Sequence, residues 1–215
     1  MAASRDGRHA RYVPPLDPTE TTLRQLLAGT ARAPAASPQP GLPLGGAPAH
    51  DRWDAPIWFA GDPGVLRAPC VAIVGTRNTS QKGAARARNL ARGLAAAGVT
   101  VVSGLARGVD REALTAAVAA GGRVVAVIGT PLDRASPQAN GPLQQLIYEQ
   151  HLLISEFRAG GLVHPSNFPR RNRTMAAVSS ATAIIEASDS SGTLHQAREC
   201  ALLGRWLFIA RACAE

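Results

Sequence analysis

The sequence predicts an α/β fold in which a mainly parallel sheet carries helices on both faces. From Val71 onward, short apolar runs alternate with longer amphipathic segments, and the breaks between them are short. The apolar runs contain few polar residues, as is typical of strands that are buried on both faces. A chain of 215 residues is long enough to bury one such core. We therefore expect one α/β domain over residues 54–215.

Residues 1–53 are expected to lie outside this domain as a mobile segment rich in proline and alanine. Within this segment, Pro18–Gly29 has leucines spaced for a short helix, whereas Ala31–Ala49 has the composition of a linker. Ordered structure is expected to begin at Asp54–Phe59, where aromatic side chains appear and a glycine-rich turn follows.

The alternating pattern predicts six strands with helices between them. The predicted strands are Val71–Val74, Thr100–Ser103, Arg123–Ile128, Leu152–Ser155, Ala183–Glu186 and Trp206–Ala210. The predicted helices are Ala84–Ala97, Arg111–Ala120, Pro142–Gln150, Arg171–Ser179 and Leu194–Leu203. Ligands of parallel sheets bind beyond the carboxyl ends of the strands, so a site is expected in the loops that follow the strands.

The first of these loops has the features of an anion site. The apolar run Val71–Val74 leads into Gly75-Thr76-Arg77, and a helical pattern begins after Gly83. Glycine permits a close approach of the backbone, and the N–H groups at a helix N-terminus attract negative charge. Arg77 lies where a phosphate would arrive. The alternative is an ordinary first strand of a sheet whose loop binds nothing.

Later loops repeat this chemistry. Ser103–Asp110 contains two glycines and an arginine, and Asp110 is placed to cap the next helix. Asn167–Thr174 is rich in arginine, and Gly192-Thr193 opens the last helix. Together these loops predict a shallow cationic groove at one edge of the sheet, which would suit a polyanion.

The charge balance favours an anionic partner. The chain has 23 basic and 15 acidic residues, a formal net charge of +8, and a single lysine, Lys82. Arginine binds phosphate and carboxylate through two parallel hydrogen bonds. A coding bias is the alternative explanation, because alanine, glycine, proline and arginine are abundant together.

The sequence lacks the signatures of several other classes of site. It contains neither the P-loop pattern G-x-x-x-x-G-K-[ST] nor the dinucleotide-binding pattern G-x-G-x-x-G, and no cluster of residues indicates a metal site. We therefore expect no cofactor. The three cysteines have no C-x-x-C spacing, and no apolar run approaches the length of a bilayer span. These observations favour a cytoplasmic protein that does not bind a membrane.

Several motifs, taken in order, resemble a known family. They are Gly61-Asp62-Pro63, Val71–Arg77, Val102–Asp110, Phe168–Arg173 and Ser191–Leu194. In residue identity and in order they resemble the motifs of the DprA/Smf family of DNA-processing proteins, over roughly residues 55–210. The resemblance implies an extended Rossmann-like three-layer fold that binds single-stranded DNA. It also implies a protein without catalysis that protects incoming single-stranded DNA in natural transformation and DNA recombination and helps to load a RecA-type recombinase.

The resemblance also implies a set of nucleic-acid-binding residues in the matching motifs. They are Gly75, Thr76, Arg77, Ser103, Gly104, Arg107, Gly108, Asn167, Phe168, Arg171, Asn172, Arg173, Gly192 and Thr193. Arg77 is implied to be the principal arginine that contacts DNA. Phe168 either offers its ring to an unstacked base or is an ordinary core aromatic.

The other two arginines of the basic motif also have two interpretations. Arg171 and Arg173 are implied to contact phosphates. The alternative is that they lie at a helix start and pair with Glu156 or Glu186.

The resemblance also implies two possible protein partners, a RecA-type recombinase and a second copy of the chain. Members of the family usually continue into further sheet and helix beyond the point at which this sequence ends, at Glu215. The family's dimer contact and its recombinase-binding surface would be expected in that portion. Both partners are therefore expectations that depend on the family resemblance alone.

Two other classes of function remain open on a related fold. Phosphoribohydrolases cleave a nucleoside monophosphate and carry Gly-Gly-x-Gly-Thr-x-x-Glu at the end of the fifth strand, where this chain has Gly192-Thr193 and then Gln196 in place of the glutamate. Glutamine cannot accept the proton that such a reaction transfers. The other class is a nucleotide sensor, which would bind a small phosphorylated ligand at the same edge without turning it over.

Overall fold

The computed structural model describes residues 12–33, 50–187 and 191–211. Its strands are β1 (Thr19–Thr22), β2 (Pro56–Gly61), β3 (Cys70–Gly75), β4 (Thr100–Ser103), β5 (Val124–Ile128), β6 (Leu152–Ser155), β7 (Ala181–Glu186) and β8 (Trp206–Ile209). Its α-helices are α1 (Leu23–Leu26), α2 (His50–Asp54), α3 (Gln81–Ala96), α4 (Val109–Ala119), α5 (Gly141–Gln150), α6 (Asn167–Ala177) and α7 (Ser191–Leu202). Two short segments, η1 (Pro63–Arg67) and η2 (Gln138–Asn140), are 3₁₀-helices.

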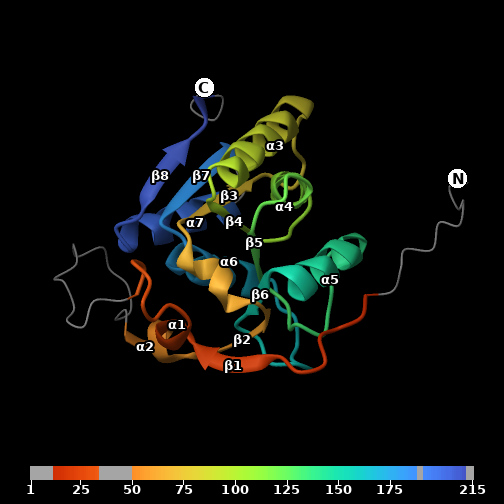
Figure 1. Cartoon of the computed structure of the whole chain (residues 1–215), viewed down its shortest axis with the longest axis vertical. Coiled ribbons are helices and arrows are strands. Elements are labelled where there is room, and N and C mark those ends of the chain that lie inside the picture. Colours follow the sequence, from red (N-terminus) through yellow and green to blue (C-terminus); the bar gives the residue numbers. More distant parts are fainter. Residues whose placement is uncertain (1–11, 34–49, 188–190, 212–215) are drawn as a thin grey trace, which may run out of the picture.

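The strands form one eight-stranded sheet in the order β1-β2-β6-β5-β4-β3-β7-β8 (Figure 1). The six strands from β6 to β8 in this order are parallel to one another. Of these eight strands only β2 runs in the opposite direction, because it pairs antiparallel with both β6 and β1. The prediction of a mainly parallel sheet is therefore confirmed, and all six predicted strands are present.

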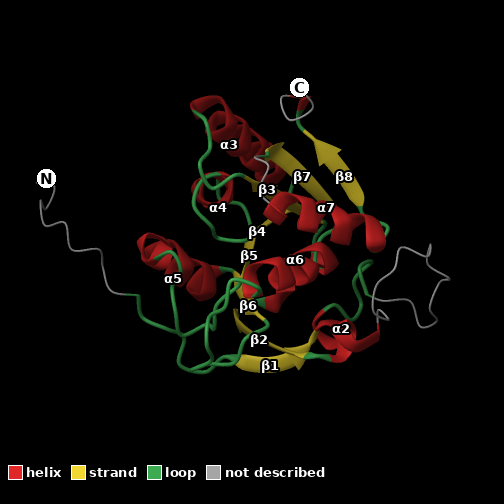
Figure 2. Ribbon diagram, turned by 180° about the vertical axis from the view of Figure 1, so that it is seen from behind, coloured by secondary structure: helices red, strands yellow, loops and turns green. Residues whose placement is uncertain are grey.

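Helices cover both faces of the sheet, as predicted. In β3, Ala72 and Val74 belong to one buried cluster and Ile73 to the other, because successive side chains of a strand point to opposite faces. The first cluster includes side chains of α1, α6 and α7, and the second includes side chains of α3, α4 and α5. Figure 1 shows α3, α4 and α5 in front of the sheet. Figure 2, which views the molecule from the opposite side, shows α6 and α7 in front of it. The arrangement is the expected three-layer fold.

The N-terminal segment differs from the expectation that residues 1–53 lie outside the domain. β1 extends the sheet through antiparallel pairing with β2, so that Thr19 lies opposite Phe59. In α1, a capping box between Thr22 and Gln25 satisfies the helix start, and Leu23 is buried in the core. Residues 12–33 thus pack against the sheet. The expected mobility falls on residues 1–11 and 34–49, which lie outside the described residues.

The chain order places a switch point beside β3. From β3 the chain builds β4, β5 and β6 on one side, then crosses through α6 to place β7 on the other side of β3. The loops after β3 and β7 are tied together, because the N–H of Thr76 donates to the carbonyl of Glu186 over 2.8 Å. In open α/β sheets the ligand site lies beyond the carboxyl ends of the strands at such a point.

Two further expectations concern cysteines and membranes. Cys70 and Cys200 are buried and free, while Cys213 lies outside the described residues. Within the described ranges, no helix combines the length and the apolar character needed to cross a bilayer.

Candidate nucleic-acid interface

A pocket of about 850 Å³ opens at the switch point. It is formed by the loops after β3, β4, β5 and β6 together with the first turns of α6 and α7. Its lining residues are Val74, Gly75, Thr76, Arg77, Asn78, Ala106, Asp110, Ser136, Val163, His164, Pro165, Phe168, Pro169, Arg171, Asn172, Met175, Gly192, Thr193 and Gln196. The loops that the sequence predicts to form a shallow cationic groove therefore border a pocket.

A second hollow, of about 440 Å³, lies between residues 13–17 and α5. Its lining contains Asp17 and Glu149 and includes no arginine or lysine. This composition is unsuited to a polyanion, so the pocket at the switch point is the candidate site.

The loop after β3 holds an arginine at the mouth of the pocket. At Gly75 a Cβ atom would lie 2.6 Å from a methyl group of Val109, so the position has no room for a side chain. Thr76 is buried, and its hydroxyl accepts the N–H of Asn78 over 3.2 Å. Arg77 is exposed, and its Cζ lies 5.3 Å from the centre of the Phe168 ring, a distance typical of cation–π contact. The loop thus presents one exposed cation on a fixed backbone.

The loop after β4 has a structural role at most of its predicted positions. The buried Ser103 hydroxyl donates to the carbonyl of Ile73 over 2.7 Å, so it joins β4 to β3 and does not reach the pocket. A Cβ atom at Gly104 would occupy the space of the Arg171 guanidinium. Gly108 has φ 73° and its Cβ position faces the backbone carbonyls of the first loop. These residues lie behind the pocket and support the loops and side chains that line it.

The prediction that Asp110 caps the next helix is wrong. The N-cap of α4 is Gly108, and Asp110 lies in the first turn of the helix. Its Oδ2 accepts the N–H groups of Gly104 over 3.1 Å and of Ala106 over 3.4 Å. The carboxylate therefore fixes the loop after β4 rather than the end of α4.

Asp110 and Arg171 are oppositely charged side chains, each only 5% exposed, in the floor of the pocket. Burial raises the pKa of Asp110, and the nearby charge of Arg171 opposes that shift. Burial also lowers the pKa of Arg171, against the effect of Asp110. Arg171 Nη1 contacts the sulfur of Met175 at 3.6 Å, and its buried Nε has no partner within the described part of the chain.

The expected pairing of Arg171 or Arg173 with Glu156 or Glu186 does not occur. Arg170 instead binds Glu156 over 2.8 Å. Arg173 is exposed and its Nε lies 3.5 Å from Glu199, which Arg52 also binds over 2.8 Å.

The remaining predicted residues lie on α6 and α7. Phe168 is partly buried and packs against Gly129, where a Cβ atom would lie 2.7 Å from the ring, yet it also lines the pocket. Asn172 Nδ2 donates to the carbonyl of Gly192 over 3.0 Å and so joins the two helices. Asn167 is buried and its amide donates to the carbonyl of Leu162 over 3.5 Å, outside the pocket lining.

The structure therefore divides the predicted residues into two sets. Those that line the pocket are Gly75, Thr76, Arg77, Phe168, Arg171, Asn172, Gly192 and Thr193. Those that do not line it are Ser103, Gly104, Arg107, Gly108, Asn167 and Arg173. Sequence reasoning missed Ser136 and His164 as lining residues. Their places in the loops after β5 and β6 were the available signal, because these loops end at the same edge.

Besides its arginines, the described lining of the pocket holds two titratable side chains, Asp110 and His164. Asp110 is the one acidic residue of its described lining, and its Oδ2 is committed to backbone N–H groups. Gln196 is 1% exposed and its Nε2 donates to the Thr182 hydroxyl over 3.1 Å. Over the described ranges, no group of histidine, cysteine and acidic side chains is arranged to hold a metal ion.

Comparison with known proteins identifies relatives. The family described as DNA recombination-mediator protein A matches residues 49–213. The DNA processing protein DprA of Streptococcus pneumoniae is 38% identical over 158 residues, which are 73% of this chain and 56% of that protein. The protein Smf of Escherichia coli is 38% identical over 154 residues, 71% of this chain and 41% of that protein. This chain thus spans about half the length of these curated relatives.

Solved structures agree with these matches. The crystal structure of DprA from Streptococcus pneumoniae superposes with a TM-score of 0.68 at 37% identity, covering 72% of this chain and 54% of that one. The structure of DNA processing protein A from Helicobacter pylori, which concerns its mode of binding single-stranded DNA, gives a TM-score of 0.67 at 31% identity and covers 72% of this chain and 71% of that one. The chain belongs to the DNA recombination-mediator protein A family, together with the DprA and Smf proteins.

Proposed function

We propose that this protein binds single-stranded DNA at the pocket beside β3 and acts as a DNA-processing protein in recombination. The observation that carries the proposal is the exposed Arg77 at the mouth of a pocket whose floor holds a second cation, Arg171. Within the described part of the chain, no acidic side chain forms an ion pair with Arg77. Its guanidinium is therefore free to bind phosphate in a bidentate way.

The shape of the pocket favours a single strand over a duplex. Its volume lies in the range of about 300–1,000 Å³ that small ligands occupy, so it is suited to about one nucleotide unit. A nucleotide enters such a site from a single strand, whose bases are unpaired and able to stack on an aromatic ring such as Phe168. Gly192 and Thr193, in the first turn of α7, add the positive end of a helix dipole.

The wider role follows from the relatives. We extend the proposal to the protection of incoming single-stranded DNA and to recombinase loading in natural transformation, in the cytoplasm, by binding rather than by catalysis. We include a RecA-type recombinase and a second copy of the chain as the protein partners in this role.

One observation favours a second candidate, a nucleotide sensor. The site contains a pocket of about 850 Å³, which is within the range of volumes that small ligands occupy. A phosphoribohydrolase is less well supported, because the carboxylate position of that family holds the buried Gln196, and Glu199 is bound to two arginines.

A competition experiment separates the two candidates. Fluorescence anisotropy would measure the binding of labelled oligo-dT to the full chain, with a duplex and AMP as competitors, at low and near-physiological salt. Binding that weakens steeply with salt and resists AMP supports the DNA-processing role. The sensor would be supported instead if AMP displaces the oligonucleotide at low salt and if the oligonucleotide does not bind at near-physiological salt.

Substitution of Arg77 tests the site itself. Arg77→Ala is expected to weaken oligo-dT binding by about 1–3 kcal/mol, or roughly 5- to 150-fold, because alanine cannot bind a phosphate. Arg67→Ala is the matched control, since Arg67 is exposed just before β3, at the opposite edge of the sheet. Equal affinities of the two variants for oligo-dT would show that Arg77 does not contribute to binding. Both variants should unfold at the wild-type temperature.

A further inference from the structure

We infer that the bound strand leaves the pocket in one direction, along the carboxyl edge of the sheet from β3 towards β6, over a row of exposed arginines. This arginine row consists of Arg77 after β3, Arg107 after β4, Arg134 after β5 and Arg158 after β6. The inference rests on the proposed function and extends it from a single pocket to a path.

The topology places these four arginines side by side. β3, β4, β5 and β6 are consecutive neighbours in the sheet and all run in the same direction, so their following loops lie at one edge (Figure 1). Neighbouring strands are about 4.8 Å apart, so the carboxyl ends of β3 and β6 are about 14 Å apart, and we take this as the scale of the row. Because phosphates in one strand of a duplex follow each other at about 3.4 Å and lie further apart in an extended strand, the row has room for about two to four of them.

The charges of the row are not neutralised within the described part of the chain. None of the four arginines forms an ion pair there, and all four are exposed. The acidic side chains of the same loops are engaged elsewhere. Asp133 accepts the N–H of Gly160 over 2.8 Å, and Glu156 binds both Arg170 and the hydroxyl of Thr174.

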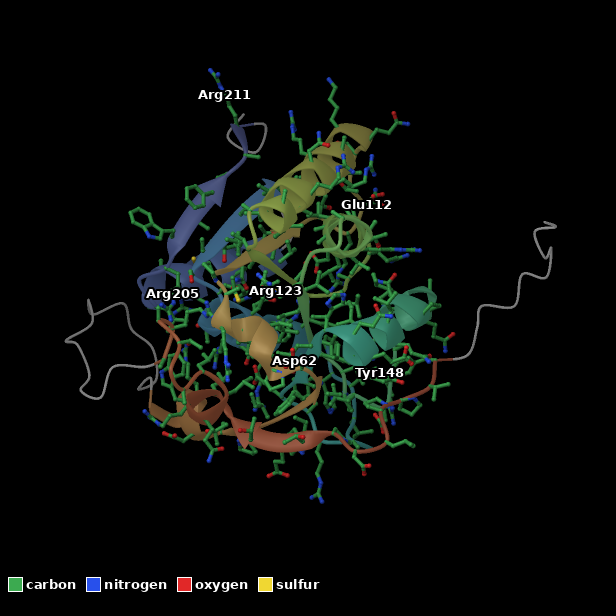
Figure 3. All side chains as sticks on the ribbon, viewed as in Figure 1. Asp62, Glu112, Arg123, Tyr148, Arg205 and Arg211 are labelled. Carbon is green, nitrogen blue, oxygen red and sulfur yellow. The ribbon has the colours of Figure 1, made fainter. Side chains whose placement is uncertain are left out.

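The other side of the pocket is unsuited to a phosphate backbone. β7 ends in Glu186, whose pKa is lowered chiefly by a hydrogen bond from the Thr79 hydroxyl, so that it stays ionised at neutral pH. Beyond it, β8 exposes Trp206 and Phe208 rather than basic side chains. Arg211 lies at the far end of β8, where Figure 3 shows it pointing away from the molecule, and β7 separates it from the row. The path therefore runs towards β6.

Charge reversal at the far end of the row provides the test. The variant combines Arg134→Glu and Arg158→Glu, and the control combines Arg67→Glu and Arg123→Glu at the opposite edge, so both change the net charge equally. None of these substitutions is expected to unfold the protein: the side chains of Arg134 and Arg158 make no hydrogen bond within the described ranges, and Arg123 is bound only to the carbonyl of Gly98. Thermal unfolding would verify this.

Each variant is measured with a trinucleotide and a dodecanucleotide of dT over a range of salt. The row variant is expected to bind the dodecanucleotide at least tenfold more weakly than the control does, and to bind the trinucleotide equally well. Its slope of log affinity against log salt should fall by about 1.4, at about 0.7 for each phosphate that the variant no longer binds.

Two outcomes would overturn the inference and are distinguishable from each other. If the row variant and the control bind the dodecanucleotide with equal affinity and equal salt slope, the strand does not follow the arginine row, although binding at the pocket is not contradicted. If the wild-type protein binds neither oligonucleotide, the proposed function itself fails.

Discussion

The inner wall of the pocket and the arginine row are built from the same motifs but differ in what their side chains contact. Here the inner wall means the two buried lining residues Asp110 and Arg171 together with the residues packed behind them, Ser103, Gly104 and Gly108. These residues are bonded to, or packed against, other parts of the protein. The row residues face water instead. A motif shared by a binding family therefore contains both the scaffold of the site and the groups that remain free for a ligand.

Arg171 and Arg77 illustrate the difference within one residue type. Arg171 lies in the space above Gly104, near the buried Asp110, and Arg77 extends over Phe168 at the mouth. Loss of a buried charge leaves its partner uncompensated, whereas loss of an exposed charge changes little within the protein. Stability and binding should therefore respond differently at the two positions.

The largest expected effect on stability is at Arg171. Arg171→Met, which keeps most of the side-chain volume, is expected to lower the free energy of unfolding by about 3–5 kcal/mol, because Asp110 is then buried without a countercharge. Urea denaturation measures the change. Arg77→Met is the matched control and should differ from the wild type by less than about 0.5 kcal/mol. Equal stability of the two variants would contradict the division between inner wall and row.

A smaller loss of stability is expected where the two loops meet. Gly108 has φ 73° and ψ −130°, and a Cβ atom there would lie 2.7 Å from the carbonyl oxygen of Arg77. Gly108→Ala is therefore expected to cost about 2–3 kcal/mol and also to weaken oligo-dT binding, because the clash shifts the loop that carries Arg77.

Gly121→Ala is the control that separates backbone strain at a positive φ from displacement of the loop that carries Arg77. Gly121 has a similar φ of 69°, but a Cβ atom there would meet nothing within 4 Å. This control should cost only about 1 kcal/mol and leave the affinity for oligo-dT unchanged. If Gly108→Ala binds as well as Gly121→Ala, the packing between the loops does not position Arg77.

Much of the fold was accessible from the sequence. The central strands are buried on both faces, so their apolar runs stand out, and the loops after them fall at one edge by topology alone. β1 was missed because Thr19–Thr22 is short, polar and directly followed by a helix start. Its strand conformation comes from pairing with β2, an interaction that local pattern does not encode.

The arrangement of side chains within the site was less accessible. Residue type and spacing indicated cations at strand ends, but whether an arginine is buried depends on the space around it. Gly104 provides that space for Arg171, and the gap between a glycine and an arginine distant in sequence cannot be read from either position. The pocket itself could not be predicted for the same reason, since its lining combines residues of α6 and α7 with the loop after β3.

The smallest expected effect is at Glu186, which combines a scaffold role with a partly exposed charge. Its Oε2 accepts the hydroxyl of Thr79 over 2.8 Å and the N–H of Ser80 over 3.0 Å, and these bonds lower its pKa below the ordinary 4.5. A carboxylate with a lowered pKa stabilises the folded state above its unfolded-state pKa, and this contribution disappears as the pH falls through the folded-state pKa. Glu186→Gln should therefore cost a few tenths of a kcal/mol at pH 7, because the group is partly exposed to solvent, and less at pH 3.

The same substitution should act on binding with the opposite sign. Removal of the negative charge beside the pocket is expected to raise the affinity for oligo-dT about twofold at low salt, and screening should abolish the gain at high salt. Urea denaturation at the two pH values and anisotropy at the two salt concentrations measure these effects. An unchanged or lower affinity at low salt would mean that the nucleotide bound in the pocket does not lie close to the end of β7. A gain in affinity with a small loss of stability is what distinguishes a partly exposed charge beside the pocket from a residue of the inner wall.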